Sequence, residues 1–557
     1  MKHIVYLLML FFPICLAFGQ QNSTFIQEKI DSLDKKQCYS DNEIKGKRPR
    51  GCAYVIKVKN QSQFNKINDD ITKAIAQGKK NIKVEVGSGV YHFRENHIMR
   101  MHEKNPEVSI TITGKNAVIT SGVNYKDDES ESSWCELSQA ENLIKLVDEK
   151  SKLCFIPFKN DIPSAIYSNY TKVQVTQWYN CFTYEIHHLD SNGIYFSVPK
   201  LSRVKFAGRE GLSINYDYLY QGIMPRFRLY DQSKEREYSA SRFVALSGCD
   251  YNYFCIKGLR FSGNKSGIGL ITINFCDIGQ LEISGCTFDS IQSSVAGIEG
   301  TDNVLFENNK VRNIKGGALS FTRGCNHIRV TNNLFENCGL GLQQNFCVKC
   351  GEAEYYIAEN TFRDFGYGAI GVGVWYGNEK KKYSGGIVEH NEIYFTPKYF
   401  ADALKHMLMD SGAIYTWTQN DDVIIRYNYI HDYTGAGDNR GIFCDDGAAN
   451  LKIYGNVVLN IPNCYNIDSR AVKDLVPGGN NNSNNFMAAN IVDGSVRFMG
   501  YGQEKRRAIK GANFLLKRNA DNKYRDNFEN LDRMEEDVKG ELFYVSDPWL
   551  KRRIKNN

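Results

Sequence analysis

A short pattern of polar and apolar positions recurs along the second half of the chain. Each copy has an Asn followed two positions later by an apolar residue, as in Asn333 and Phe335. Six copies align Asn309, Asn333, Asn360, Asn391, Asn428 and Asn456, at steps of 24, 27, 31, 37 and 28 residues, and Asn490 is a candidate seventh. Self-similarity at such a period is typical of solenoid folds. We expect each Asn to adopt the left-handed conformation at a turn and to bond its counterparts in neighbouring coils, while the apolar residue enters the core.

This pattern predicts an all-β fold, a right-handed parallel β-helix (solenoid) with an N-terminal capping helix and a C-terminal cap or tail. Phe64, Ile67, Ile71 and Ile75 follow helical spacing within residues 62–77, and Gly78 comes directly after them. Alternating runs at 82–86, 90–93, 109–113 and 117–120 predict short strands. We expect the helix to cover the open N-terminal end of the stack.

Changes in composition divide the chain into six parts. These are a signal peptide (1–19), a polar leader (20–60), the cap helix with the first coils (61–123), an irregular β insertion (124–250), the β-helix core with the catalytic cleft (251–502) and a charged C-terminal cap or tail (503–557). Steps longer than a minimal coil of about 24 residues indicate loop insertions, two of which we place at about 394–411 and 433–440. Solenoids often gather such insertions on their binding face, so we expect a cleft there.

The N-terminus predicts export. An apolar run over 4–18 ends at small residues, Ala17 and Gly19, as is typical of a cleaved secretory signal. The run is too short for a comfortable membrane span. We therefore expect a secreted or periplasmic protein without a membrane span. A net charge of +6 over 557 residues gives no argument for a nucleic-acid partner.

Sixteen cysteines are many for a cytosolic enzyme, and removal of the signal leaves an odd number. Cys347 and Cys350 form a lone Cys-x-x-Cys motif without a suitably spaced His. The spacing favours a local disulfide or buried thiols over a zinc site, and we predict no bound metal.

Two segments, 410–417 and 441–447, carry the candidate chemistry. The 28-residue step aligns Ile414 with Ile442, Tyr415 with Phe443, Thr416 with Cys444 and Trp417 with Asp445. Strand alternation then directs the first and third pairs into the core, and the other two pairs outward to the cleft. Asp446 ends the second strand, and Asp410 lies just before the first.

Clustered carboxyl groups beside aromatic rings suit glycoside hydrolysis. That reaction uses two carboxyl groups that flank the scissile bond, and neighbouring carboxylates raise one another's pKa so that one stays protonated as the acid. Broad aromatic faces suit stacking against sugar rings. The predicted catalytic residues are Asp410, Asp445 and Asp446, and the predicted substrate-binding residues are Tyr415, Trp417, Phe443, His406, Arg440 and Trp375. The spacing does not assign acid, base or nucleophile among the three Asp.

The segments 412–416, 429–432 and 441–447 resemble the signature region of secreted bacterial β-helix carbohydrate-active enzymes, and glycoside hydrolase family 141 in particular. The segments 86–93 and 110–114 are similar to that family's first coils. The resemblance implies a glycosidase that acts on a plant, algal or host polysaccharide, with Asp410, Asp445 and Asp446 as the carboxylates. The family pattern Ile-Tyr-Leu-Asp-Asp departs here, because Phe443 and Cys444 replace Tyr and Leu.

Two other functions fit the same residues. A polysaccharide lyase acting on uronic acids would use Lys405, His406 or Arg440 as a base, with the acidic residues as Ca²⁺ ligands. A non-catalytic β-helix surface protein would bind glycan without consuming it. The sequence leaves the sugar, the linkage, the stereochemical outcome and the oligomeric state open.

Overall fold

A computed structural model describes most strands of the repeat region and parts of the rest of the chain. The described residues are 28–36, 48–92, 99–100, 105–120, 134–136, 145–148, 150–157, 170–177, 180–198, 201–206, 209–214, 226–231, 246–263, 271–291, 294–322, 324–339, 345–351, 354–373, 385–397, 411–419, 423–433, 440–449, 451–468, 486–488, 490–499, 509–510, 514–515 and 547–556. The predicted signal peptide lies outside them.

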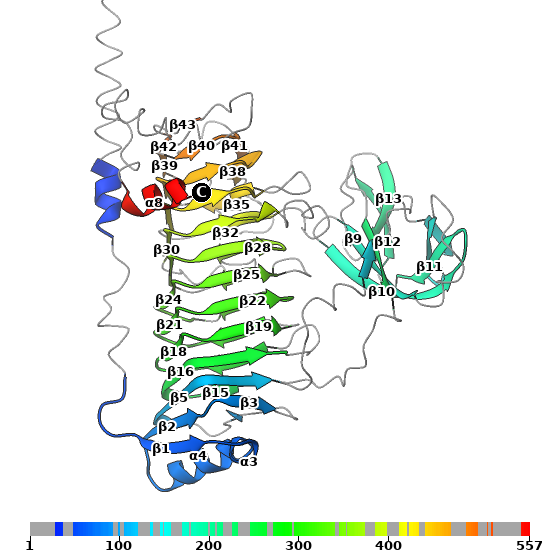
Figure 1. The fold of residues 1–557 in the computed structure, drawn as a ribbon. Coiled ribbons are helices and arrows are strands. Elements are labelled where there is room, and N and C mark those ends of the chain that lie inside the picture. The colour runs from blue at the N-terminus through cyan, green and yellow to red at the C-terminus, as the bar shows by residue number, and fades with distance from the viewer. Residues whose placement is uncertain are drawn as a thin grey trace, which may run out of the picture.

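The described strands wind into a tall stack whose coils each place one strand on each of three faces (Figure 1). Face 1 contains β1 (Tyr54–Val58), β2 (Asn81–Val86), β5 (Asn105–Thr120), β16 (Tyr251–Ser262), β18 (Leu281–Ser284), β21 (Val304–Glu307), β24 (Ile328–Thr331), β27 (Tyr355–Ala358), β30 (Gly386–Glu389), β33 (Ile424–Arg426), β36 (Lys452–Tyr454), β39 (Phe486–Ala488) and β42 (Ile509–Lys510). Face 2 contains β3 (Gly89–His92), β19 (Thr287–Ile291), β22 (Lys310–Ile314), β25 (Leu334–Cys338), β28 (Thr361–Phe365), β31 (Glu392–Tyr394), β34 (Tyr429–His431), β37 (Val457–Leu459), β40 (Ile491–Val492) and β43 (Phe514–Leu515). The long strands β5 and β16 run through both faces and join them into one 23-stranded sheet.

Face 3 is a separate 11-stranded sheet and carries the candidate site. It contains β4 (Met99–Arg100), β15 (Leu246–Cys249), β17 (Ile271–Cys276), β20 (Ser294–Glu299), β23 (Leu319–Thr322), β26 (Phe346–Cys350), β29 (Gly368–Gly373), β32 (Gly412–Gln419), β35 (Arg440–Ala449), β38 (Asn463–Asp468) and β41 (Ser495–Met499). Neighbouring strands on this face pair in parallel, as on the other two. The predicted parallel β-helix is therefore confirmed.

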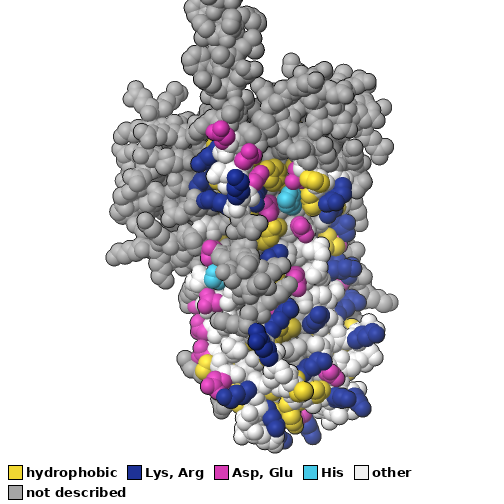
Figure 2. Space-filling model, turned by 90° about the vertical axis from the view of Figure 1, so that its left-hand side faces the viewer, with side chains coloured by type: hydrophobic (Ala, Val, Ile, Leu, Met, Phe, Trp, Pro, Cys, Tyr) yellow, Lys and Arg dark blue, Asp and Glu magenta, His cyan; other side chains and the backbone are white. Residues whose placement is uncertain are grey.

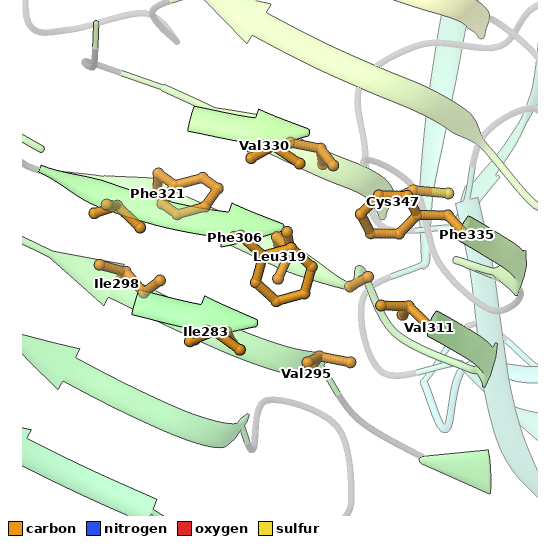
Figure 3. Close-up of a cluster of buried hydrophobic side chains, with 14 of the residues drawn as sticks. Ile283, Val295, Ile298, Phe306, Val311, Leu319, Phe321, Val330, Phe335 and Cys347 are labelled. Carbon is orange, nitrogen blue, oxygen red and sulfur yellow. The ribbon is translucent and has the colours of Figure 1, made fainter. Parts of the chain in front are cut away.

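The interior of the stack is a continuous column of apolar side chains. Inward residues of the three faces form one cluster that extends from Ile56 near the N-terminal end to Val492. Figure 3 shows part of this column, in which Phe306 and Phe335 lie among aliphatic side chains from neighbouring coils. Equivalent Phe rings also stack between coils, with centroids 4.8 Å apart for Phe335 and Phe362. Repetition of one apolar position thus builds the core coil by coil.

The recurring Asn forms a buried ladder, as predicted. The backbone N–H and Nδ2 of Asn333 both donate to Oδ1 of Asn360, at 3.0 and 2.9 Å. The same pair of bonds links every consecutive member from Asn309 to Asn490, so the seventh candidate belongs to the ladder. Each ladder Nδ2 also donates to a backbone carbonyl of an earlier coil, as from Asn333 to Phe306. The buried amides are therefore satisfied within the fold.

One detail of the ladder prediction is wrong. The left-handed backbone belongs to the residue before each ladder Asn from Asn309 to Asn456, with φ of 55° at Asn332, 52° at His390 and 53° at Tyr427. The ladder Asn itself must keep its side chain inside the stack to reach the next coil. The tight turn is therefore made one residue earlier, even where that residue is a bulky His or Tyr.

The N-terminal end of the stack is covered by a helix, in two pieces where one was predicted. Helix α3 (Gln61–Phe64) is capped by the Asn60 side chain, and α4 (Ile67–Ala76) follows after a break at 65–66. Phe64, Ile67 and Ile71 join the core cluster, so the helical pair closes the open end. Residues 54–58, which we placed in the polar leader, form β1 instead, because Ile56 and Val58 alternate inward as the first layer of the core.

The insertion contains an antiparallel sheet with a core of its own. Its strands are β6 (Trp134–Glu136), β7 (Lys145–Asp148), β8 (Leu153–Pro157), β9 (Tyr170–Gln177), β10 (Asn180–Leu189), β11 (Gly193–Ser197) and β14 (Arg226–Asp231), with a hairpin of β12 (Leu201–Phe206) and β13 (Arg209–Ile214). Figure 1 shows it as a body separate from the stack. Its buried residues, such as Ile156, Val175 and Phe196, form a cluster distinct from the main core. Residues 246–249, which we assigned to the insertion, belong to the stack as β15.

Segments from both chain ends pack on the outer side of faces 1 and 2. A helix at 28–34 and the C-terminal helix α8 (Pro548–Asn556) contribute Ile30, Leu33 and Leu550 to one hydrophobic cluster with outward residues of the stack. The Arg426 guanidinium binds Asp34 of the first helix at 3.1 Å and also pairs with buried Glu389. Several coils closer to the N-terminal end of the stack, Arg48 binds Glu282 of β18 through two hydrogen bonds. The described leader residues therefore contact the stack at two separate levels.

Ion pairs also link successive coils on the outside of the stack. Arg312 binds Asp289 at 2.5 Å, and Arg363 binds Glu336 at 2.7 Å. Figure 2 shows basic and acidic side chains interspersed on the described surface. None of the described helices is long and apolar enough to cross a membrane.

Candidate functional site

The outer side of face 3, at strands β32 and β35, contains the described part of the candidate site. The observed register pairs Ile414 with Ile442, Tyr415 with Phe443, Thr416 with Cys444 and Trp417 with Asp445, as the 28-residue step predicted. Ile414, Ile442 and Cys444 lie in the main core, whereas Tyr415 and Phe443 lie in a separate cluster. Strand alternation therefore gave the correct face for these residues.

The exposure of the two rings differs from our expectation. We predicted Tyr415 and Phe443 as an open aromatic platform, but only 6% and 2% of their surfaces are exposed. They pack with Phe346 of β26 and Tyr367 in an outer aromatic cluster, with the Tyr415 and Phe443 ring centroids 4.8 Å apart. Rings so enclosed by one another have no free face for a sugar. These two residues therefore support the site from beneath.

Arg440 is also packed and not a free surface cation. Its guanidinium carbon lies 3.9 Å above the centroid of the Phe443 ring, and the residue is 7% exposed. A guanidinium on an aromatic face gains a cation–π attraction in addition to packing. Arg440 therefore covers Phe443 and places a positive charge on the side of the sheet that carries Asp445.

Asp445 is the predicted carboxylate whose side chain the structure describes. It is partly exposed, and its Oδ2 accepts a 2.5 Å hydrogen bond from the hydroxyl of Tyr415. Hydrogen bonds between a hydroxyl and an ionised carboxylate are short, and they are stronger than those between neutral groups. A buried tyrosine thus holds one carboxylate at the end of a rigid run of strand.

The strand register breaks directly after Asp445. Trp417 pairs with Asp445, but the next partners along the strands are Gln419 and Ala449, so one residue of β32 opposes three of β35. Bulges of this kind end the regular alternation and redirect side chains, and they are frequent beside active sites. Asp446 is the first residue of β35 within this bulge.

The other predicted residues, or their side chains, lie outside the described part of the chain. Asp410, His406 and Trp375 lie outside the described residues, as does the loop insertion before Asp410. Trp417 and Asp446 belong to β32 and β35, but their side chains lie outside the described part. Within the described part of the chain, no group of three or more His, Cys, Asp or Glu is arranged to hold a metal ion.

Sequence reasoning missed three residues that support the site. Phe346 and Tyr367 complete the outer cluster, and the Tyr433 hydroxyl bonds the Tyr367 carbonyl at 3.2 Å. The signal was present one coil earlier, because β29 pairs with β32 in the register Gly371 with Tyr415. Extending the alignment by that coil places Gly371 beside Tyr415. A glycine there leaves room for a neighbouring ring, which suggests that aromatic side chains cover this part of the sheet.

The cysteines described in the structure are free thiols. Cys347 and Cys350 are buried in the core, which matches the buried-thiol alternative and excludes a disulfide between them. Burial raises the pKa of both thiols well above the usual value. Burial also raises the pKa of Cys444, which lies beside Asp445, to about 12. These thiols therefore stay protonated and unreactive at neutral pH.

A second group of ionisable residues lies on face 2. Burial would lower the pKa of His431, but hydrogen bonds and charge from Asp432 and Glu392 outweigh it and raise this pKa. The imidazole stacks on Tyr394 with centroids 4.8 Å apart, and Arg553 of α8 binds Glu392 at 2.9 Å. The arrangement is an ion-pair network at the docking site of α8, in keeping with a structural role.

Comparison with known proteins supports the fold. The family described as "Right handed beta helix region" matches residues 269–486. No curated protein matches the sequence. A solved "Glycoside hydrolase" has 11% identity and a TM-score of 0.46, and the alignment covers 83% of this chain and 97% of that one.

Two further solved structures have the same kind of similarity. The mannuronan C-5 epimerase AlgE4 A-module of Azotobacter vinelandii has 10% identity and a TM-score of 0.31, covering 82% of this chain and 91% of that one. DFA-IIIase of Arthrobacter chlorophenolicus A6 has 12% identity and a TM-score of 0.30, covering 84% and 92%. Similarity at this level carries no information about activity. The matched family and the observed coils agree that this chain contains a right-handed parallel β-helix.

Proposed function

We propose that this protein is a secreted glycoside hydrolase whose catalytic centre includes Asp445. The observation that carries the proposal is the placement of Asp445, a partly exposed carboxylate at a strand bulge that accepts a hydrogen bond from a buried tyrosine. A catalytic carboxylate needs a fixed orientation and access to substrate, and this position supplies both.

The mechanism we propose uses two carboxyl groups and no metal. One carboxylic acid gives its proton to the glycosidic oxygen as the bond to the anomeric carbon breaks. The other, as a carboxylate, either removes a proton from the attacking water or bonds to the anomeric carbon, and water later releases that sugar. Asp445 supplies one of these groups, and Asp410 or Asp446 supplies the other.

The substrate that fits is a plant, algal or host polysaccharide, and the region that binds it lies beyond the aromatic cluster. Because Tyr415 and Phe443 are enclosed, sugar stacking falls to Trp417, the register partner of Asp445. Trp375 and His406 remain candidates from the neighbouring loops. Arg440 contributes positive charge on the side of the sheet that carries Asp445, and it does not serve as the base of a lyase, because its guanidinium is packed on Phe443.

The test is an activity screen of the exported protein on plant, algal and host glycans, with and without EDTA. Reducing ends should appear without the ultraviolet absorbance of an unsaturated product, and EDTA should have no effect. An unsaturated product that disappears with EDTA would replace the hydrolase with a metal-dependent lyase. Retention of glycans without any product would replace it with a binding protein.

A further inference from the structure

We infer that Tyr415 is a positioning residue that fixes Asp445 in its ionised form, which makes Asp445 the base or nucleophile of the pair and leaves the acid role to Asp410 or Asp446. The inference rests on the proposed function for these chemical roles. The contact between Tyr415 and Asp445 stands independently of that function. The inference gives Tyr415 a positioning role in place of the sugar-stacking role that we predicted from its residue type.

The hydrogen bond has one possible direction when Asp445 is ionised. A carboxylate only accepts, so the Tyr415 hydroxyl is the donor across the 2.5 Å between its oxygen and Oδ2 of Asp445. A donor aimed at a carboxylate stabilises the charged form over the protonated one. A general acid needs the opposite environment, one that keeps its proton at working pH. Asp445 therefore fits the role that requires a negative charge.

The Tyr415 ring is held so firmly that the hydroxyl has little freedom to leave. Phe346, Tyr367 and Phe443 surround it, with centroid distances of 5.7, 6.2 and 4.8 Å. The Phe346 ring lies directly over Gly371, where a Cβ would come within 2.6 Å of a ring carbon. Glycine at that position is therefore what allows the aromatic cluster to fill the surface of the sheet. The cluster acts as a support for one hydroxyl.

The charged and titratable groups around Asp445 come from two adjacent strands. Besides Tyr415 on β32, these are Arg440 and Cys444 on β35. Asp446 follows on β35 and Asp468 ends β38, but their side chains lie outside the described part. Arg440, packed on Phe443 on the same side of the sheet, adds positive charge that also favours ionised Asp445. Removal of the Tyr415 hydroxyl shifts this balance toward the protonated carboxyl, and that shift is measurable.

The first test needs no activity. A double-mutant cycle of Tyr415→Phe and Asp445→Asn measures their coupling in the free energy of unfolding, because Phe keeps the ring and removes only the hydroxyl. We expect coupling at neutral pH that falls by at least half at about pH 3.5, where a carboxyl group begins to protonate. The control cycle pairs Tyr91→Phe with Asp445→Asn, since Tyr91 is buried and bonds only backbone carbonyls near the other end of the stack.

Equal coupling at both pH values, or none beyond the control, would overturn the inference.

The second test is the pH profile of kcat and KM for Tyr415→Phe. We expect kcat to fall about tenfold more at acidic than at alkaline pH, with KM unchanged, because the base is protonated more readily. A uniform fall at all pH values would reduce Tyr415 to a packing residue. A wild-type protein that is inactive on every glycan would contradict the proposed function, while the coupling would still decide whether Tyr415 holds Asp445 ionised.

Discussion

Replacement of one ladder Asn should cost far more than replacement of an exposed Asn. Oδ1 of Asn391 accepts two hydrogen bonds from Asn360, one from the Asn360 backbone N–H at 3.2 Å and one from the Asn360 Nδ2 at 3.0 Å. Its own Nδ2 lies 2.9 Å from the Ile357 carbonyl and 3.0 Å from Oδ1 of Asn428. All of these groups are buried, so water cannot replace the lost partner.

The magnitude for Asn391→Ala follows from the two donors of Asn360 that lose their acceptor. A buried donor without a partner costs about 1–3 kcal/mol, so the variant should lose about 2–6 kcal/mol of unfolding free energy. Folded domains of this kind have a margin of about 5–15 kcal/mol, so the change takes a large share of the total.

Urea unfolding and amide hydrogen exchange together measure this effect. The exchange data are needed because solenoids often unfold in parts, and we expect faster exchange at the Asn360 amide in particular. Asn326→Ala is the control, since the side chain of this exposed residue bonds only the Asp302 side chain and its loss should cost less than about 0.5 kcal/mol. Equal costs for the two variants would refute the claim that the ladder stabilises the stack.

Three further predictions test other parts of the fold. Arg426→Ala should lower unfolding stability by about 3–5 kcal/mol in urea titrations, because it leaves Glu389 buried without its cation; a loss below about 1 kcal/mol would contradict this. The pKa of His431 is raised by its two neighbouring carboxylates, so its stabilising effect is complete at acidic pH and fades as pH rises through that pKa. His431→Gln should therefore lose less stability than the wild type between about pH 6 and pH 9, as measured by urea midpoints, and identical slopes would exclude this role. Among the described free thiols, a maleimide should label exposed Cys52 in the native protein and buried Cys444 only after unfolding, as read by peptide mass mapping; native labelling of Cys444 would show that its surroundings are open.

The repeat made the stack predictable because each coil copies one local pattern. Inward Phe335, the ladder Asn residues and the pairing of Trp417 with Asp445 all follow from period and alternation. The position of the left-handed residue was not predictable from the repeat. The period sets the spacing between turns, but it does not determine which of the two turn residues has a positive φ. The break between α3 and α4 and the strand β1 were also missed, as short segments give weak periodic signals.

The face of each site residue was predictable, whereas its exposure was not. Alternation placed Tyr415 and Phe443 outside the β-helix core, but burial also depends on Phe346 and Tyr367, which lie more than 40 residues earlier in the chain. The hydrogen bond from Tyr415 to Asp445 likewise depends on side-chain geometry across two strands. The docking of residues 28–34 beside α8 joins the two ends of the chain, and no local pattern contains that contact.

The most direct test of the account compares turnover of the wild type with that of Asp445→Asn on the glycan that the screen identifies as substrate. Asp302→Asn is the matched control, because Asp302 forms an isolated β-bridge and a side-chain hydrogen bond with Asn326, several coils from the candidate site on face 3. We expect Asp445→Asn to lose at least about a thousandfold in kcat while it still folds and unfolds cooperatively, and Asp302→Asn to keep full activity. Full activity of Asp445→Asn would contradict the assignment of this carboxylate to the catalytic centre.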